Sequence, residues 1–167
     1  SLLIIELFGF LFLIRKRMFT YQRLDFIADS YIPVLFFISL FIFAVDIFRN
    51  GFKKHCLQLG SVVLSVLIVY LVMAVDNRFE IWPKFDLDYS THTALALVFV
   101  IFLSSRGTLA LTLSVLSFVL YIALMIYQEY HTLADIFSTA LFLAPIFCLL
   151  IFSEVIRKRS SKKMDLQ

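Results

Sequence analysis

The chain has 167 residues, of which 62% are hydrophobic and 16% are charged, and its mean hydropathy is +0.96. A soluble domain is about half apolar and about a quarter charged, so this composition excludes an ordinary soluble domain and predicts an integral membrane protein. The formal net charge of +3 is small, and no nucleic-acid partner is expected.

Six apolar runs follow one another along the chain, at about 2–14, 31–48, 57–75, 91–104, 108–126 and 132–152. A helix needs about 20 apolar residues to cross hydrocarbon, so the first and fourth runs are short. No run alternates as a barrel strand does, and helices satisfy their own backbone groups in lipid. We therefore predict an all-α integral membrane protein. Residues 1–167 would form a single domain, a six-transmembrane-helix bundle with a basic cytoplasmic tail at 153–167.

Basic residues orient this predicted bundle. With six crossings, the loop "RNGFKKH", Arg106, the tail and the start of the chain fall on one side, which the positive-inside rule makes cytoplasmic. We expect a multi-pass protein of a bacterial inner membrane with its site facing the periplasm or the exterior. The segment 15–29, with Arg15, Arg17 and Arg23, falls on the outer side against the rule. It is either an interfacial segment or a basic cluster that faces an anionic substrate.

Two histidines stand at the outer starts of predicted helices, His92 in "DYSTHT" and His131 in "YHTLAD". Asp135 lies four residues after His131, so a helix would put both on one face, where the carboxylate can accept the imidazole Nδ1–H. His92 could then act as a general acid, and Ser90 with the free N–H groups of the next turn could bind phosphate. We predict that both rings face one cavity at a separation below about 10 Å.

Other uses of these residues are interfacial anchoring, a haem held by His92 and His131, or a zinc site that adds Asp135. Both histidines are predicted near one membrane face, and the spacing matches no recognised metal motif. No metal and no cofactor are therefore expected.

The stretch "YSTHTALAL" and, about forty residues later, "YHTLADIF" resemble two motifs of the type-2 phosphatidic acid phosphatase superfamily. Those motifs read Pro-Ser-Gly-His and Ser-Arg-x5-His-x3-Asp, and the Gly-His-Thr and His-Tyr-Thr-x-Asp patterns of the sphingomyelin synthase branch are similar. The resemblance implies a six-helix core with its site at one membrane face. It also implies that His131 is a nucleophile forming a phosphohistidine, that Asp135 orients it, that His92 protonates the leaving alcohol and that Ser90 contacts phosphate.

The chain departs from the family pattern at several positions. Thr91 and Tyr89 stand in place of the Gly and Pro of the second motif, and Met125 stands in place of the Arg that clamps phosphate. The first motif, Lys-x6-Arg-Pro, is absent, and the corresponding loop offers only Arg78 and Lys84. Phosphoryl transfer needs cations around the equatorial oxygens, so other residues must supply them.

The expected function is that of a membrane lipid phosphatase or phosphotransferase acting on a lipid phosphate or polyprenyl diphosphate at the outer face. Substitute cations are Arg78 and Lys84, or else Arg15, Arg17 and Arg23 from the first basic segment. The alternatives are a catalytically inactive lipid-binding pseudoenzyme and a small membrane subunit.

Overall fold

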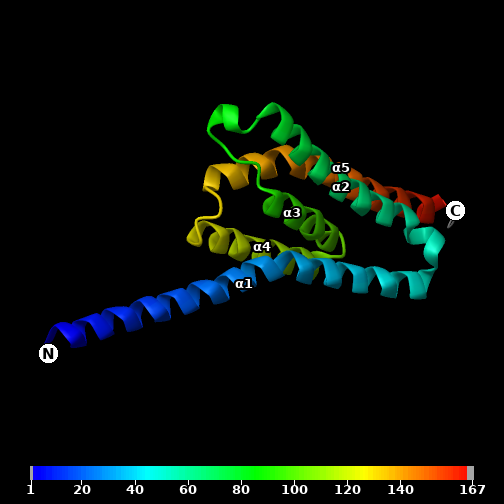
Figure 1. The fold of residues 1–167 in the computed structure, drawn as a ribbon. Coiled ribbons are helices and arrows are strands. Elements are labelled where there is room, and N and C mark those ends of the chain that lie inside the picture. Colours follow the sequence, from blue (N-terminus) through cyan, green and yellow to red (C-terminus); the bar gives the residue numbers. More distant parts are fainter. Residues whose placement is uncertain (1, 165–167) are drawn as a thin grey trace.

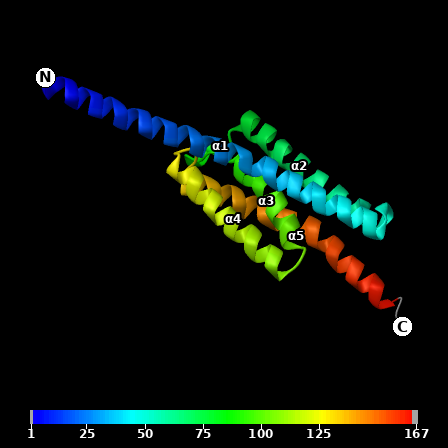
Figure 2. The same ribbon diagram turned by 90° about the horizontal axis from the view of Figure 1, so that it is seen from below.

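The computed structural model describes the backbone of residues 2–164 and the side chains of residues 21–49, 51–52 and 55–153. Over this backbone the chain forms five α-helices and one short 3-10 helix, without a strand (Figure 1). They are α1 (Leu2–Asn50), α2 (Phe52–Phe79), η1 (Pro83–Phe85), α3 (Thr91–Ser104), α4 (Thr108–Tyr127) and α5 (Leu133–Met164). The short α3 contacts all four other α-helices and forms the centre of the bundle (Figure 2).

The all-α prediction is confirmed. Four helical stretches are long and apolar enough to cross a membrane, namely residues 21–49, 55–79, 108–127 and 133–153. They contain nearly all of the four runs that were predicted to be long enough. The predicted run 91–104 coincides with α3. These features indicate an integral membrane protein.

The predicted count of six helices is wrong, because the runs 2–14 and 31–48 both lie on α1. This helix has 49 residues and is about 73 Å long at 1.5 Å per residue, far more than the thickness of a bilayer core. The segment 15–29 between the two runs is charged but contains neither Gly nor Pro. Charge ends an apolar run, whereas only a backbone breaker or a competing cap ends a helix.

The two ends of the bundle differ in which helices begin there. We call the end where α2 and α4 finish and α3 and α5 begin the histidine end, and the opposite end the arginine end. The chain termini lie far apart, with the start of α1 beyond the histidine end and the end of α5 at the arginine end (Figures 1 and 2). This arrangement differs from the predicted one, in which the chain start and the basic tail lie at the same end of the bundle (Figures 1 and 2).

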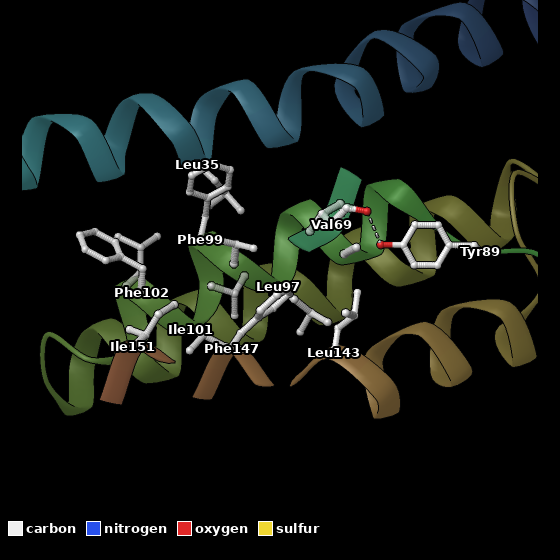
Figure 3. Close-up of a cluster of buried hydrophobic side chains, with 14 of the residues drawn as sticks. Leu35, Val69, Tyr89, Leu97, Phe99, Ile101, Phe102, Leu143, Phe147 and Ile151 are labelled. Carbon is white, nitrogen blue, oxygen red and sulfur yellow. Dashed lines mark hydrogen bonds between the residues drawn. The ribbon is translucent and has the colours of Figure 1, made fainter. Parts of the chain in front are cut away.

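The helix α3 begins below the level at which α2 ends (Figure 1). Its 14 residues span only about 21 Å. The hydroxyl of Tyr89, two residues before α3, donates to the carbonyl of Val69 at 3.1 Å (Figure 3). Val69 lies ten residues before the end of α2, or about 15 Å along that helix. The segment after η1 therefore turns back into the bundle before α3 starts.

From Thr93 to Leu103, nearly every side chain of α3 is buried against the other helices. Leu97, Phe99, Ile101 and Phe102 of α3 are buried against neighbours from the other helices. On α5, the fully buried Leu143, Phe147 and Ile151 recur every four residues and form one ridge towards α3 (Figure 3). This explains why run 91–104 is apolar all round.

At the arginine end, an ion pair joins the turn after α3 to α1. The Arg106 guanidinium forms an ion pair with the Asp46 carboxylate of α1 and lies over the Phe102 ring at 4.4 Å. The turn between α3 and α4 is thereby tied to the last part of α1.

Candidate active site at the histidine end

The structure brings His92 and His131 together. His92 is the second residue of α3, and His131 lies two residues before α5. Their ring centroids are 6.5 Å apart and the rings are tilted by 54°. His92 is exposed and His131 is half-buried. The prediction that the two rings lie within about 10 Å of each other is confirmed.

A short extended segment sets this separation. The backbone N–H of Asp88 donates to Asp135 Oδ1 at 2.7 Å, and that of Ser90 donates to Thr139 Oγ1 at 3.1 Å. Alternate N–H groups of an extended chain point the same way, and residues four apart share a helix face. The segment 88–90 is therefore held along one face of α5, which places His92 beside His131.

Asp135 caps α5 instead of binding the imidazole. Its Oδ2 accepts from the backbone N–H of Thr132 at 2.8 Å and from the Thr132 hydroxyl at 2.7 Å. In return, Thr132 Oγ1 accepts from the backbone N–H of Asp135 at 3.2 Å, so the two residues form a capping box. With Asp88 on Oδ1, both carboxylate oxygens are engaged.

The predicted hydrogen bond from His131 Nδ1 to Asp135 is not formed. His131 Nδ1 is buried without a hydrogen-bond partner. The prediction was wrong because it assumed that His131 already belongs to the helix. Since α5 begins at Leu133, the rule that residues four apart share a face does not reach back to it.

Asp135 still acts on His131 through its charge. Burial lowers the pKa of His131 below its ordinary value of 6.5, and the neighbouring His92 lowers it further. The carboxylates of Asp135 and Asp88 oppose this shift. At neutral pH the His131 imidazole is therefore uncharged, the form that has a lone pair for nucleophilic attack.

Ser90 has a structural role that conflicts with phosphate binding. It is fully buried, and its Oγ accepts from the backbone N–H of Thr93 at 3.2 Å as the N-cap of α3. The same hydroxyl lies 2.8 Å from Thr93 Oγ1. The structure does not support the prediction that Ser90 contacts phosphate, because the side chain is fully buried and its oxygen caps α3.

Three of the candidate cations, Arg78, Lys84 and Arg23, have described side chains at or near the histidine end. Arg78, in the last turn of α2, and Lys84, in η1, are both exposed. On α1, Arg23 lies near Tyr21, whose hydroxyl donates to the Gln128 carbonyl at the end of α4 at 2.8 Å. The side chains of Arg15 and Arg17 lie outside the described residues.

The position that the family resemblance assigns to the clamping Arg belongs to the core. Met125 is only 1% exposed and packs with Ala28, Ala96, Tyr121 and Ile136. An arginine could not replace it without placing a charge inside this cluster.

Three residues that position the site were missed from the sequence, namely Asp88, Thr132 and Thr139. The pattern "TLAD" before an apolar run is a capping-box signal and could have identified Thr132. The contacts of Asp88 and Thr139 join segments about fifty residues apart, and no local pattern predicts them.

Among the described side chains, no three His, Cys, Asp or Glu residues are grouped so that they could hold a metal ion. Compared with protein-family models, curated proteins and solved structures, the chain matches none. The function must therefore be inferred from the geometry of the site.

Proposed function

We propose that the chain is a membrane lipid phosphatase or phosphotransferase of the type-2 phosphatidic acid phosphatase kind. It would act on a lipid phosphate or polyprenyl diphosphate at the histidine end through a phosphohistidine on His131. The observation that carries this proposal is the approach of the two rings to 6.5 Å, because one phosphoryl group fits between a nucleophile and an acid at that spacing. We also propose that this end faces the periplasm of a bacterial inner membrane.

The reaction would proceed in two steps. In the first, the lone pair of His131 Nε2 attacks phosphorus, the bond from phosphorus to the lipid oxygen breaks, and protonated His92 gives its proton to that oxygen. In the second, water or an alcohol attacks phosphorus, the phosphorus–nitrogen bond breaks, and His92 takes a proton from the attacking oxygen. The carboxylates of Asp135 and Asp88 favour the cationic imidazole that the first step creates, as they favour protonated His131.

The negative charge on the phosphoryl group needs nearby cations. Arg78 and Lys84 are exposed on the segment that leads to α3, so their side chains have room to fold towards a bound headgroup. Arg23, Arg15 and Arg17 of α1 are the second set. A cation contact of this kind contributes about 3 kcal/mol, or about a hundredfold in rate, by analogy with the loss of one oxyanion-hole donor.

The test is phosphate release from a panel of lipid phosphates by purified protein and its histidine variants. His131→Ala should abolish turnover and the acid-labile phosphoenzyme. His92→Ala should slow turnover about a hundredfold or more on an alkyl phosphate and much less on a phosphate with an activated leaving group. His55→Ala, at the arginine end, is the matched control and should leave turnover unchanged. Full activity in His131→Ala would exclude His131 as the nucleophile.

The second candidate function is a lipid-binding protein without catalysis. The burial of Met125 favours it, since the position of the family's phosphate clamp holds an apolar side chain in the core. This function predicts that the parent protein binds lipid phosphates saturably and releases no phosphate from any of them.

A further inference from the structure

A cavity of about 440 Å³ lies towards the histidine end, between the end of α2, the segment around η1 and the start of α5. We call it the Trp82 pocket. Its walls include Leu71, Val75, Trp82, Leu87, Ser138 and Phe142. The volume lies within the range of about 300–1,000 Å³ that is typical of small-ligand sites.

The walls of the Trp82 pocket suit hydrocarbon. Its polar wall groups are already engaged, because Trp82 Nε1 donates to Ser138 Oγ at 3.1 Å and Ser138 Oγ donates to the Asp135 carbonyl at 3.1 Å. Trp82 is buried, and its ring packs edge-on against Tyr89 and Phe142 at centroid distances of 5.1 Å and 5.6 Å. No charged side chain lines the pocket. A headgroup would find nothing to bind there, whereas an alkyl chain would.

The mouth of the pocket opens where lipid chains would be. Leu71 and Phe142 are 62% and 53% exposed, and both belong to stretches that could cross a membrane. An alkyl chain could therefore enter sideways without passing through water.

The pocket is also aligned with the histidine pair. Asp135, Ser138 and Phe142 follow one face of α5 at intervals of three and four residues. Asp135 holds the backbone of Asp88, and the preceding Leu87 lines the pocket. The pocket therefore begins about one helical turn below the residues that position the ring pair. A lipid has the same order along the membrane normal, with its headgroup above its chain.

We propose that the Trp82 pocket binds the hydrocarbon chain of the lipid whose phosphate is held by the histidine pair. This proposal rests on the proposed function for the identity of the headgroup. It makes the substrate class a phosphate ester of a long alkyl or prenyl alcohol, and it makes chain length a determinant of affinity. Because the chain enters from lipid and not from water, this dependence comes from packing against the pocket walls and not from the transfer of methylenes out of water.

Trp82 is the only tryptophan of the chain, so its fluorescence reports on the pocket directly. The probe is octadecyl phosphate with bromine atoms at mid-chain, titrated into the protein in lipid nanodiscs. Saturable quenching is expected. Val75→Phe should fill part of the cavity and weaken the apparent affinity by at least about threefold, because part of the chain loses its packing against the pocket walls. Val63→Phe makes the same change at an exposed position of α2 outside the pocket and should bind like the parent.

Bulk lipid is distinguished by a matrix of phosphatidylcholine brominated at the same depth. Equal quenching by that matrix, or unchanged quenching by octadecyl phosphate in Val75→Phe, would overturn the proposal. If Val75→Phe fails to fold, Phe142→Ala serves instead, since widening the mouth should also weaken the binding of a single chain, and unchanged affinity there would equally overturn it.

Turnover separates the two proposals. Saturable quenching without phosphate release from any lipid would support the pocket and contradict the enzyme. Phosphate release that is equally fast from butyl and octadecyl phosphate, and unaffected by Val75→Phe, would support the enzyme and overturn the pocket.

Discussion

At the histidine pair, burial gives different properties to two side chains of the same chemistry. His131 is half-buried, and both desolvation and the neighbouring His92 lower its pKa. His92 is exposed at the second position of α3. An uncharged buried ring suits a nucleophile, and an exposed ring can exchange protons with water, so the roles proposed for them agree with their surroundings.

Asp88 is expected to tune His131 through its charge. Because the Asp88 carboxylate raises the pKa of His131, Asp88→Asn should lower that pKa further, while the backbone bond from Asp88 to Asp135 is kept. Nitrogen-15 chemical shifts of the three histidines over a pH titration measure the effect. Asp86→Asn, an exposed neighbour on the same segment, is the control and should leave His131 unchanged.

The same shift has a consequence for stability. Since the folded-state pKa of His131 lies below 6.5, the unfolded chain takes up the proton first as the pH falls. The contribution of His131 to the free energy of unfolding is therefore complete above pH 6.5 and decreases as the pH drops towards the folded-state pKa. In Asp88→Asn, where that pKa should be lower, the decrease should extend over a wider pH range. A higher His131 pKa in this variant would contradict the assignment.

At the scale of single elements, the start of α5 organises the site. Asp135 closes the capping box with Thr132 and receives the Asp88 N–H, and Thr139 receives the Ser90 N–H one turn later. One helix end therefore both begins α5 and fixes the segment that leads into α3. The distance between His92 and His131 depends on these contacts.

Asp135→Asn should release the Asp88 N–H, because the single acceptor oxygen that remains is expected to stay with the two Thr132 donors. The amide keeps one acceptor oxygen and loses the other, so one of the two sets of contacts is broken, at a cost of about 1–2 kcal/mol in the free energy of unfolding. Hydrogen exchange at the Asp88 amide should become faster. Thr132→Ala removes the cap hydroxyl alone and should destabilise α5 while leaving the Asp88 amide protected. Equal protection of that amide in both variants would show that Asp135 does not hold the segment.

The elements that could be predicted from the sequence are those whose signal is a long apolar run. The stretches 108–127 and 133–153 and the central α3 were predicted to within one residue of their bounds, and 55–79 to within four. The stretch 21–49 begins ten residues before the predicted run 31–48. The helix α1 was divided wrongly, because charged residues at 15–29 mark a change of surroundings and not a change of backbone conformation.

The roles of Ser90 and Asp135 were misread for a related reason. Groups suited to phosphate or imidazole are equally suited to the N–H groups at a helix start, and the capping contacts are formed within the fold itself.

The pairing of the two histidines was predictable for a different reason. Alternating passes put the starts of α3 and α5 at one end, whatever happens before α2. Dividing α1 into two helices therefore did not affect the prediction that His92 and His131 lie together. It affected only the end of the bundle at which the chain was expected to begin. In the whole molecule, α1 crosses the bundle once and continues beyond the histidine end (Figure 1).

A labelling experiment can distinguish this arrangement from six passes. In a Cys148→Ala background, the exposed Cys56 lies at the arginine end, and Lys84→Cys, made in a variant that also carries Cys56→Ser, places a thiol at the histidine end. An impermeant maleimide added to sealed vesicles should label the two variants from opposite sides, with Cys56 on the cytoplasmic side because the basic residues gather at its end. In permeabilised vesicles both thiols should be labelled fully, which controls for their reactivity.

A peptide tag placed before the first residue should be accessible from the same side as Lys84→Cys, since α1 passes through the bundle a single time. Accessibility of that tag from the Cys56 side would instead require a further crossing between residues 2 and 21, and would restore the six-pass arrangement.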